Sequence, residues 1–217
     1  FQGILIAPST LQYTQNERNA LQEEIFSDFK GPVISLDYES DYFDTIMLDD
    51  AVAMQKMTEH LVNEHCYTDI AFLSGPLWHA HAQRRLEGYK RGLEACNIPY
   101  DETKVFEGNF WYGGGQRIAT QMIRQGLLPQ ALMCANQAMA IGAYRTFIEN
   151  GIRLPEDIAI TGFDALDDGV AENYPITSMI RDGECTGRRA AQALRSKLEG
   201  HPPMDIPEET SSFLIWD

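Results

Sequence analysis

Residues 131–164 constrain the fold of this chain more than any other segment. An apolar run in this segment ends at the polar Asn136, a helical stretch follows, and a second apolar run ends at Asp164. Two strands joined by a single crossover helix are expected to lie parallel in one sheet. We therefore expect Asn136 and Asp164 at the same sheet edge, beyond the carboxyl ends of the strands, where open α/β proteins bind small ligands.

The rest of the chain repeats this alternation of strands and helices. Short apolar runs bounded by turn residues predict strands at residues 3–7, 33–36, 70–73, 105–107, 132–134 and 158–161, with further short strands at 178–180 and 213–216. Helical patterns cover residues 16–29, 51–64, 83–96, 114–125, 137–150 and 187–199. Alternation at these lengths predicts an α/β fold of parallel sheets flanked by helices.

Three breaks in this alternation predict a division into two lobes. The first lies at residues 45–50, where a short apolar run leads into Asp49-Asp50, a favourable start for a helix. The others are the irregular stretch 165–174 and the proline-rich stretch 200–203. Three crossings between lobes would place residues 1–49 and 181–202 in an N-terminal lobe, and residues 50–180 and 203–217 in a C-terminal lobe.

Composition limits the functional classes. The 217 residues carry a net charge of −15, which argues against this chain itself holding a DNA backbone. No apolar run approaches the roughly 20 residues of a membrane-spanning helix, and no signal-peptide pattern begins the chain. The four cysteines form no CxxC pair, which favours a reduced, cytoplasmic setting.

A series of motifs, in order along the chain, resembles the effector-binding core of LacI-family transcription regulators. The motifs are FQGILI (1–6), PVISLD (32–37), LSGPL (73–77) with RLEGY (85–89), CAN (134–136) with MAIG (139–142), LPEDI (154–158) and GFD (162–164). Each motif is weak alone, but their order and gaps together are specific. The resemblance covers essentially the whole chain.

The resemblance implies a two-lobed, periplasmic-binding-protein-like fold that closes on a small ligand. The chain departs from the family pattern in three ways. The family's core opens with two strand–helix units ahead of the point where this chain begins, so we expect the first lobe to lack them. Gln137 replaces the usual aspartate after Asn136. The family's helix-turn-helix is also outside this chain, so DNA would be bound only through another domain.

By position, the family's ligand contacts fall on Asp37, His79, His81, Arg85, Phe110, Asn136 and Asp164. These side chains suit a sugar, because carboxylates accept hydrogen bonds, Asn does both, and Arg offers a fixed fork of donors. An aromatic ring can lie against the apolar face of a sugar. Structural alternatives remain open: Asp164 could cap a loop, Arg85 could form a salt bridge, Asn136 could cap a helix and Phe110 could belong to the core.

Motifs of catalysis and metal binding give little support to other functions. His79 and His81 lie two residues apart, but no third residue is spaced to complete a metal site. The Gly113-Gly114-Gly115 run has neither the Walker lysine nor the Rossmann spacing, and reads as a flexible helix entry. We therefore expect no enzyme activity, cofactor or metal.

The sequence thus predicts the ligand-sensing domain of a bacterial transcription regulator. Its effector would be a sugar or a similar small polar metabolite, bound between the lobes. We expect a homodimer, as the resemblance implies, and no contact with membranes. The alternative is a solute-binding protein that serves a sugar transporter.

Overall fold

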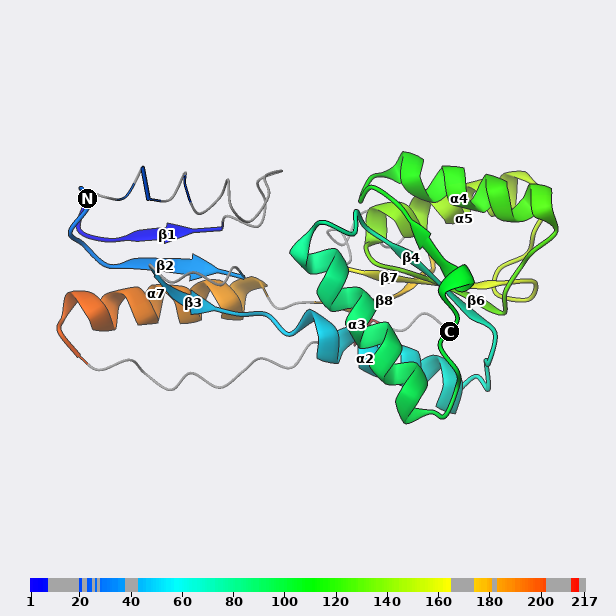
Figure 1. Ribbon diagram of the computed structural model, residues 1–217, viewed down its shortest axis with the longest axis horizontal. Helices are drawn as coiled ribbons and strands as arrows, with labels where there is room; N and C mark the ends of the chain where they lie inside the picture. Colours follow the sequence, from blue (N-terminus) through cyan, green and yellow to red (C-terminus); the bar gives the residue numbers. More distant parts are fainter. Residues whose placement is uncertain are drawn as a thin grey trace. The chain divides into compact units, whose positions relative to one another are not determined.

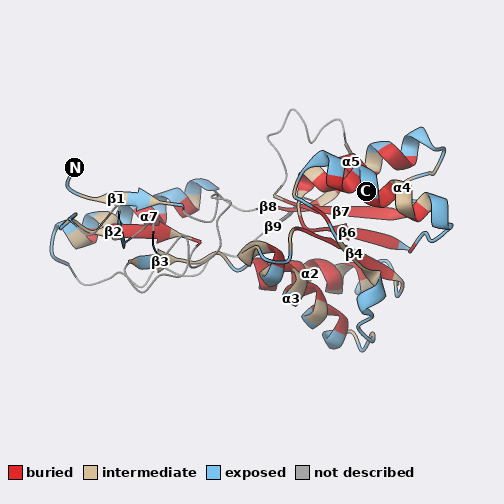
Figure 2. Ribbon diagram, turned by 45° about the horizontal axis from the view of Figure 1, so that its top comes forward, coloured by how far each residue is buried: buried red, intermediate tan, exposed pale blue. Residues whose placement is uncertain are grey.

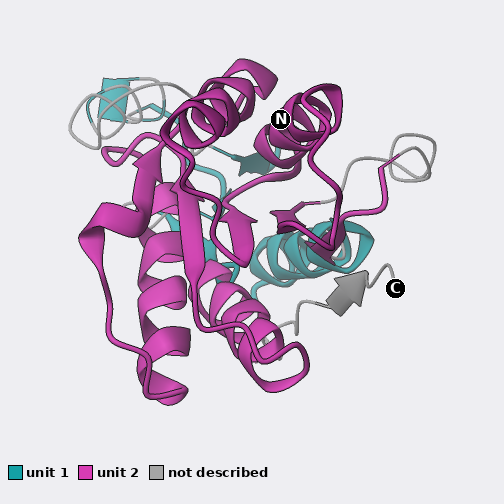
Figure 3. Ribbon diagram, turned by 90° about the vertical axis from the view of Figure 1, so that its right-hand side faces the viewer, with its two compact units in different colours: residues 1–49, 182–210 teal, residues 50–181, 211–217 magenta. Residues whose placement is uncertain are grey.

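The computed structural model describes residues 1–7, 20, 23–24, 26, 28–37, 43–164, 174–180 and 183–201, and the backbone of 212–214. The predicted helix at residues 16–29 falls mostly outside the described residues. The chain divides into two compact units, Phe1–Asp49 with Asp182–Thr210, and Asp50–Arg181 with Ser211–Asp217 (Figure 3).

The first unit is built on a small parallel sheet. Its strands β1 (Ile4–Ile6), β2 (Val33–Leu36) and β3 (Asp44–Ile46) lie in that order. Helix α7 (Gly183–Leu198) packs on β1 and β2 (Figure 1). The apolar run after residue 43 is therefore a strand, although it is too short to assign from sequence.

The second unit contains a six-stranded sheet in the order β5-β4-β6-β7-β8-β9. Its strands are β4 (Ile70–Ser74), β5 (Val105–Glu107), β6 (Ala131–Cys134), β7 (Ala159–Phe163), β8 (Thr177–Ile180) and β9 (Ser212–Leu214). The first five run parallel, and β9 pairs antiparallel with β8. The predicted parallel pairing of the strands before Asn136 and Asp164 is confirmed.

Helices cover both faces of this sheet. Helices α2 (Asp50–Asn63) and α3 (Ala80–Ala95) pack together on one face, and α4 (Tyr112–Gln125) and α5 (Gln137–Glu149) pack together on the other (Figure 2). Phe72, Leu73, Leu132 and Met133 in the central strands are fully buried. Coverage from both sides explains why β4 and β6 are continuously apolar rather than alternating.

The glycine-rich run is part of α4, not a flexible entry to it. The helix begins at Tyr112, two residues before the predicted start. A Cβ on Gly115 would overlap the carbonyl oxygen of Met139, and one on Gly142 would overlap the carbonyl oxygen of Tyr112. These two glycines therefore let the backbones of α4 and α5 approach closely.

A matched pair of substitutions in α4 tests this close approach. Gly115→Ala should destabilise the protein by about 1–3 kcal/mol, the usual cost of overpacking a core. Gly113→Ala should be neutral or stabilise by up to about 1 kcal/mol, because no atom lies within 4 Å of its added Cβ and Ala favours helix. Urea unfolding of both variants measures the difference. Equal effects would contradict the packing role of Gly115.

Within the described residues, no helix is both long enough and apolar enough to cross a membrane.

Cys134 is fully buried in β6, and its burial raises the pKa of the thiol. This cysteine therefore acts as a small apolar core residue, as a strand position predicts.

Candidate functional site

Six of the seven residues predicted as ligand contacts form one connected cluster in the second unit. They are His79, His81, Arg85, Phe110, Asn136 and Asp164. The cluster lies at the carboxyl ends of β6 and β7, because Asn136 lies two residues beyond β6 and Asp164 directly follows β7. Asp37 belongs to the first unit. It follows β2, is buried, and its backbone N–H donates to Ile46 (2.8 Å).

Arg85 is the centre of the cluster. Its side chain comes from α3 and is only 4% exposed. Its Nε donates to Asp50 Oδ2 (3.0 Å), Nη1 to the carbonyl of Ala135 (2.7 Å), and Nη2 to Asp164 Oδ2 (3.0 Å). The guanidinium also lies 4.0 Å from the centroid of the Phe163 ring. Arg85 therefore forms salt bridges, as the structural alternative predicts. The guanidinium group is rigid and planar, so its N–H groups can donate to three acceptors in different directions.

Asp50 is a member of the cluster that sequence reasoning missed. It is the first residue of α2 and is fully buried. Its Oδ2 accepts from Arg85 and lies 2.8 Å from Nδ1 of His81. The sequence indicated only a helix start here, because its ion-pair partners lie 31 and 35 residues away. A buried carboxylate requires such partners to offset the loss of hydration.

The two histidines have different roles. Nδ1 of His81 faces both Asp50 Oδ2 and Arg84 Nη2 (3.1 Å), and one ring nitrogen cannot donate and accept at once. We assign the proton on Nδ1 to the shorter bond, that to Asp50. His79 caps α3, because its Nδ1 accepts from the backbone N–H of His81 (3.2 Å). Helix α3 therefore begins at Ala80, three residues before the predicted start.

Phe110 forms an aromatic wall of the cluster. Its ring packs directly over Gly75, where any Cβ would overlap the ring, and meets the His79 ring edge to face at 5.3 Å. The φ angle of Phe110 is +64°, and that of Asp164 is +57°. Positive φ is uncommon for residues other than glycine, and such conformations concentrate at functional sites.

Asn136 caps a helix, as one of its two sequence interpretations predicts. Its Oδ1 accepts from the backbone N–H of Met139 (3.0 Å) at the start of α5, and its Nδ2 donates to the carbonyl of Phe110 (2.8 Å). The amide therefore ties α5 to the aromatic wall. Its ligand contact stays a prediction.

Gln137, the departure from the family pattern, turns into the sheet. It is buried, and its Oε1 accepts a hydrogen bond from the hydroxyl of Ser178 in β8. The same oxygen lies so close to Gly162 in β7 that a Cβ there would overlap it. Gly162 therefore makes room for the glutamine, which links α5 to β7 and β8.

This geometry combines fixed charges with aromatic surfaces. Arg85 is almost fully enclosed, whereas the side chain of Asp164 is 31% exposed. The carboxylate of Asp164 is thus the charged group of the Arg85–Asp164 pair that is open to a ligand. Trp78, which is 51% exposed, adds aromatic surface near the start of α3. Pockets for small polar ligands combine such apolar walls with a few oriented polar groups.

Comparisons with known proteins agree with this architecture. The chain matches the periplasmic binding protein-like domain over residues 58–212. It is 31% identical over 197 residues to the HTH-type transcriptional repressor PurR of Vibrio atlanticus (strain LGP32), covering 91% of this chain and 58% of that protein. The chain thus spans less than two thirds of the length of this relative.

Solved structures show the same fold. The lac repressor dimer bound to operator and the anti-inducer ONPF aligns with a TM-score of 0.79 at 26% identity, over 98% of this chain and 72% of that one. The Escherichia coli transcriptional repressor ascG aligns with a TM-score of 0.82 at 21% identity, over 100% of this chain and 77% of that one. The chain belongs to the periplasmic binding protein-like family, and its fold is that of the effector-binding core of LacI-family regulators.

Two arginines of α3 allow a direct test of the cluster. Arg85→Ala should destabilise the protein by about 3–5 kcal/mol, because it leaves the buried carboxylate of Asp50 without its guanidinium. Arg91→Ala, which removes an exposed pair with Glu87 on the same helix, should change stability by less than about 1 kcal/mol. Urea unfolding of both variants measures this contrast. A loss for Arg85→Ala as small as that for Arg91→Ala would refute the central role of Arg85.

Proposed function

We propose that this chain is the ligand-sensing domain of a bacterial transcription regulator. Its effector is a sugar or a similar small polar metabolite, bound at the Arg85 cluster of the second unit. The observation that carries the proposal is the Arg85–Asp164 pair, which holds a partly exposed carboxylate at the carboxyl edge of the second unit's sheet. Family membership and the similarity to PurR repressors support a regulatory role.

Within this proposal, the cluster residues divide their tasks. Asp164 accepts hydrogen bonds from ligand hydroxyls, while Arg85 orients it. Phe110 packs against an apolar face of the ligand, and His79 presents its Nε2 proton, because its Nδ1 is an acceptor in the helix cap. Asp50 and the carbonyl of Ala135 are positioning groups that keep Arg85 in place. Asp37 belongs to the first unit, and its ligand contact stays a prediction.

Ligand binding would then shift a conformational equilibrium of the domain, and an attached output domain would respond to that shift. DNA would be bound by a domain outside these residues, in a cytoplasmic protein. The solute-binding alternative is not favoured, because the relatives are named as transcriptional repressors. We propose no catalytic role for the cluster.

A thermal-shift screen of monosaccharides, disaccharides, sugar phosphates and nucleosides tests the proposal on the full-length protein. A ligand at about 100 times its dissociation constant should add about 2.7 kcal/mol of apparent stability. The shift should be lost or greatly reduced in Asp164→Asn, which keeps the shape of the side chain but removes its charge.

Asp157→Asn is the matched control, because Asp157 precedes β7 and Asp164 follows it, so the two aspartates stand at opposite ends of one strand. This variant should bind like the parent protein. A shift that survives Asp164→Asn, or one that Asp157→Asn abolishes equally, would place the ligand elsewhere. No shift with any compound of the panel would reject the sugar-like class of effector.

We also propose that the protein forms a homodimer, as the lac repressor does in its operator complex. Trp111 and Tyr112 are exposed side by side at the start of α4, and aromatic side chains are enriched in protein interfaces. Sedimentation velocity should show a dimer that Trp111→Glu dissociates. Leu127→Glu, at an equally exposed apolar residue just beyond the other end of α4, should leave the dimer intact. A monomeric parent protein would refute the proposal.

A further inference from the structure

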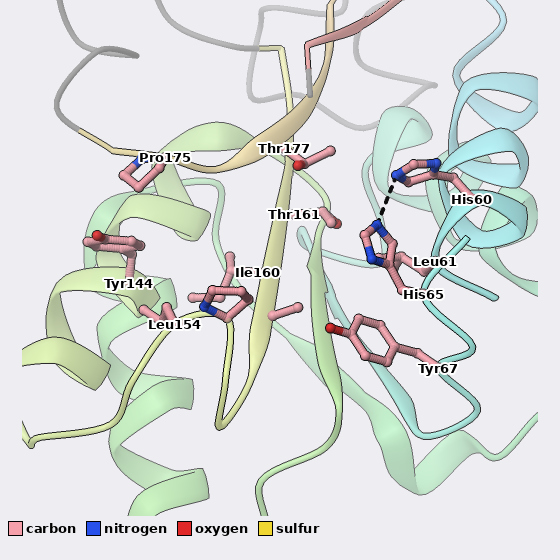
Figure 4. A pocket seen from close by; sticks show the side chains of 12 residues that line it. His60, Leu61, His65, Tyr67, Tyr144, Leu154, Ile160, Thr161, Pro175 and Thr177 are labelled. Carbon is pink, nitrogen blue, oxygen red and sulfur yellow. Dashed lines mark hydrogen bonds between the residues drawn. The ribbon is translucent and has the colours of Figure 1, made fainter. Parts of the chain in front are cut away.

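A cavity of about 260 Å³ lies in the second unit, apart from the Arg85 cluster. It is bounded by the end of α2, the following turn, the first residues of β7 and β8, and α5 (Figure 4). Its polar and aromatic lining consists of His60, His65, Tyr67, Tyr144, Thr161 and Thr177. None of the seven predicted effector contacts lines it, so the proposed effector site does not account for it.

Two histidines form one wall of this cavity. The Nε2 atoms of His60 and His65 lie 3.3 Å apart, and their rings meet at an angle of 82° (Figure 4). His60 lies in the last turn of α2, and His65 lies two residues beyond the helix. The turn that brings them together is held by the backbone. Cys66 has a φ of +59°, its N–H donates to Val62 (3.0 Å), and the N–H of Tyr67 donates to Leu61 (3.1 Å).

The spacing of the two nitrogens fits shared coordination of a metal ion. Zinc binds imidazole nitrogen at about 2.0–2.1 Å in tetrahedral geometry, which places two nitrogen ligands about 3.3–3.4 Å apart. Imidazole nitrogen is a suitable ligand for zinc, copper, iron and nickel.

A second feature of the cavity calls for a polar occupant. The side chain of Thr161 is buried, and among the described residues its Oγ1 has no hydrogen-bond partner. Thr161 belongs to the lining of the same cavity as the two imidazoles. Water or another ligand on a metal ion is normally held by hydrogen bonds from neighbouring groups. The hydroxyl of Thr161 is the group of this lining that such a ligand would need to reach.

We propose that His60 and His65 bind one divalent transition-metal ion through their Nε2 atoms, with the remaining coordination positions open to the cavity. Among the described residues, no third His, Cys, Asp or Glu side chain joins this pair in a three-ligand cluster. Water or a small molecule in the cavity supplies the other ligands. The sequence predicts no metal, so this site differs from that prediction. Two histidines five residues apart, one in a helix and one beyond its end, do not match a known metal-ligand spacing.

Calorimetric titration of Zn²⁺ into the metal-free protein, prepared without a histidine tag, tests the proposal. The parent protein should bind one ion per chain with a saturable isotherm. His60→Gln and His65→Gln should each weaken binding at least tenfold, because even changes to groups behind the ligands weaken metal binding by about 10–100-fold. His201→Gln, which removes an exposed histidine of the first unit, should bind like the parent.

Three results would overturn the proposal: absence of saturable binding, parent-like affinity in both cavity variants, or an equal loss in His201→Gln. Each would leave the short contact as a hydrogen bond between the two imidazoles. Because Gln can still form a hydrogen bond, the cavity variants are expected to fold, and circular dichroism of the metal-free proteins checks this.

Thr161→Val tests whether the hydroxyl of Thr161 contributes to metal binding in addition to the two histidines. The substitution keeps the shape of the side chain and removes only a buried hydroxyl without a partner, so the metal-free melting temperature should stay unchanged or rise. The affinity for Zn²⁺ should fall, and the absorption spectrum of bound Co²⁺ should change. Parent-like affinity and spectrum would show that the coordination sphere does not extend to Thr161.

Discussion

Arg85 joins four separate parts of the second unit. From α3 it reaches the first residue of α2, the carbonyl that follows β6 and the carboxylate that follows β7. Because the guanidinium is almost fully buried, each of these partners has to stay in place to offset its lost hydration. The Asp164 carboxylate, which is partly exposed, is held by this side chain, and with it the chemistry proposed for effector binding.

Several residues of the candidate site have a structural role and are also predicted to contact the ligand. Asn136 caps α5 and also fixes the backbone of Phe110, while His79 caps α3 and packs its ring on that phenylalanine. The structural and ligand interpretations of such residues are therefore not exclusive. A loop residue whose polar atoms are already bonded to the protein is preorganised, since little conformational freedom remains to be lost when a ligand binds.

Much of the fold could be predicted from the sequence. The strands that end before Asn136 and Asp164, their parallel pairing and the flanking helices all follow from apolar periodicity. The starts of α3 and α4 were predicted too late, for different reasons. His79 is not a usual capping residue, and glycines normally weaken a helix, although at Gly115 the absence of a Cβ is what permits the contact with α5.

The sequence by itself determined the type and order of the elements, and which polar residues follow the strands, because these depend on local periodicity and turn chemistry. Only the tertiary structure decided which side chains meet. Asp50 pairs with Arg85 across 35 residues, Arg85 with Asp164 across 79, and Gln137 with Ser178 across 41. Such contacts depend on how each helix packs onto the sheet. A charged or polar group that is buried without a partner costs free energy, and this cost favours these pairs over others that the same sequence could form.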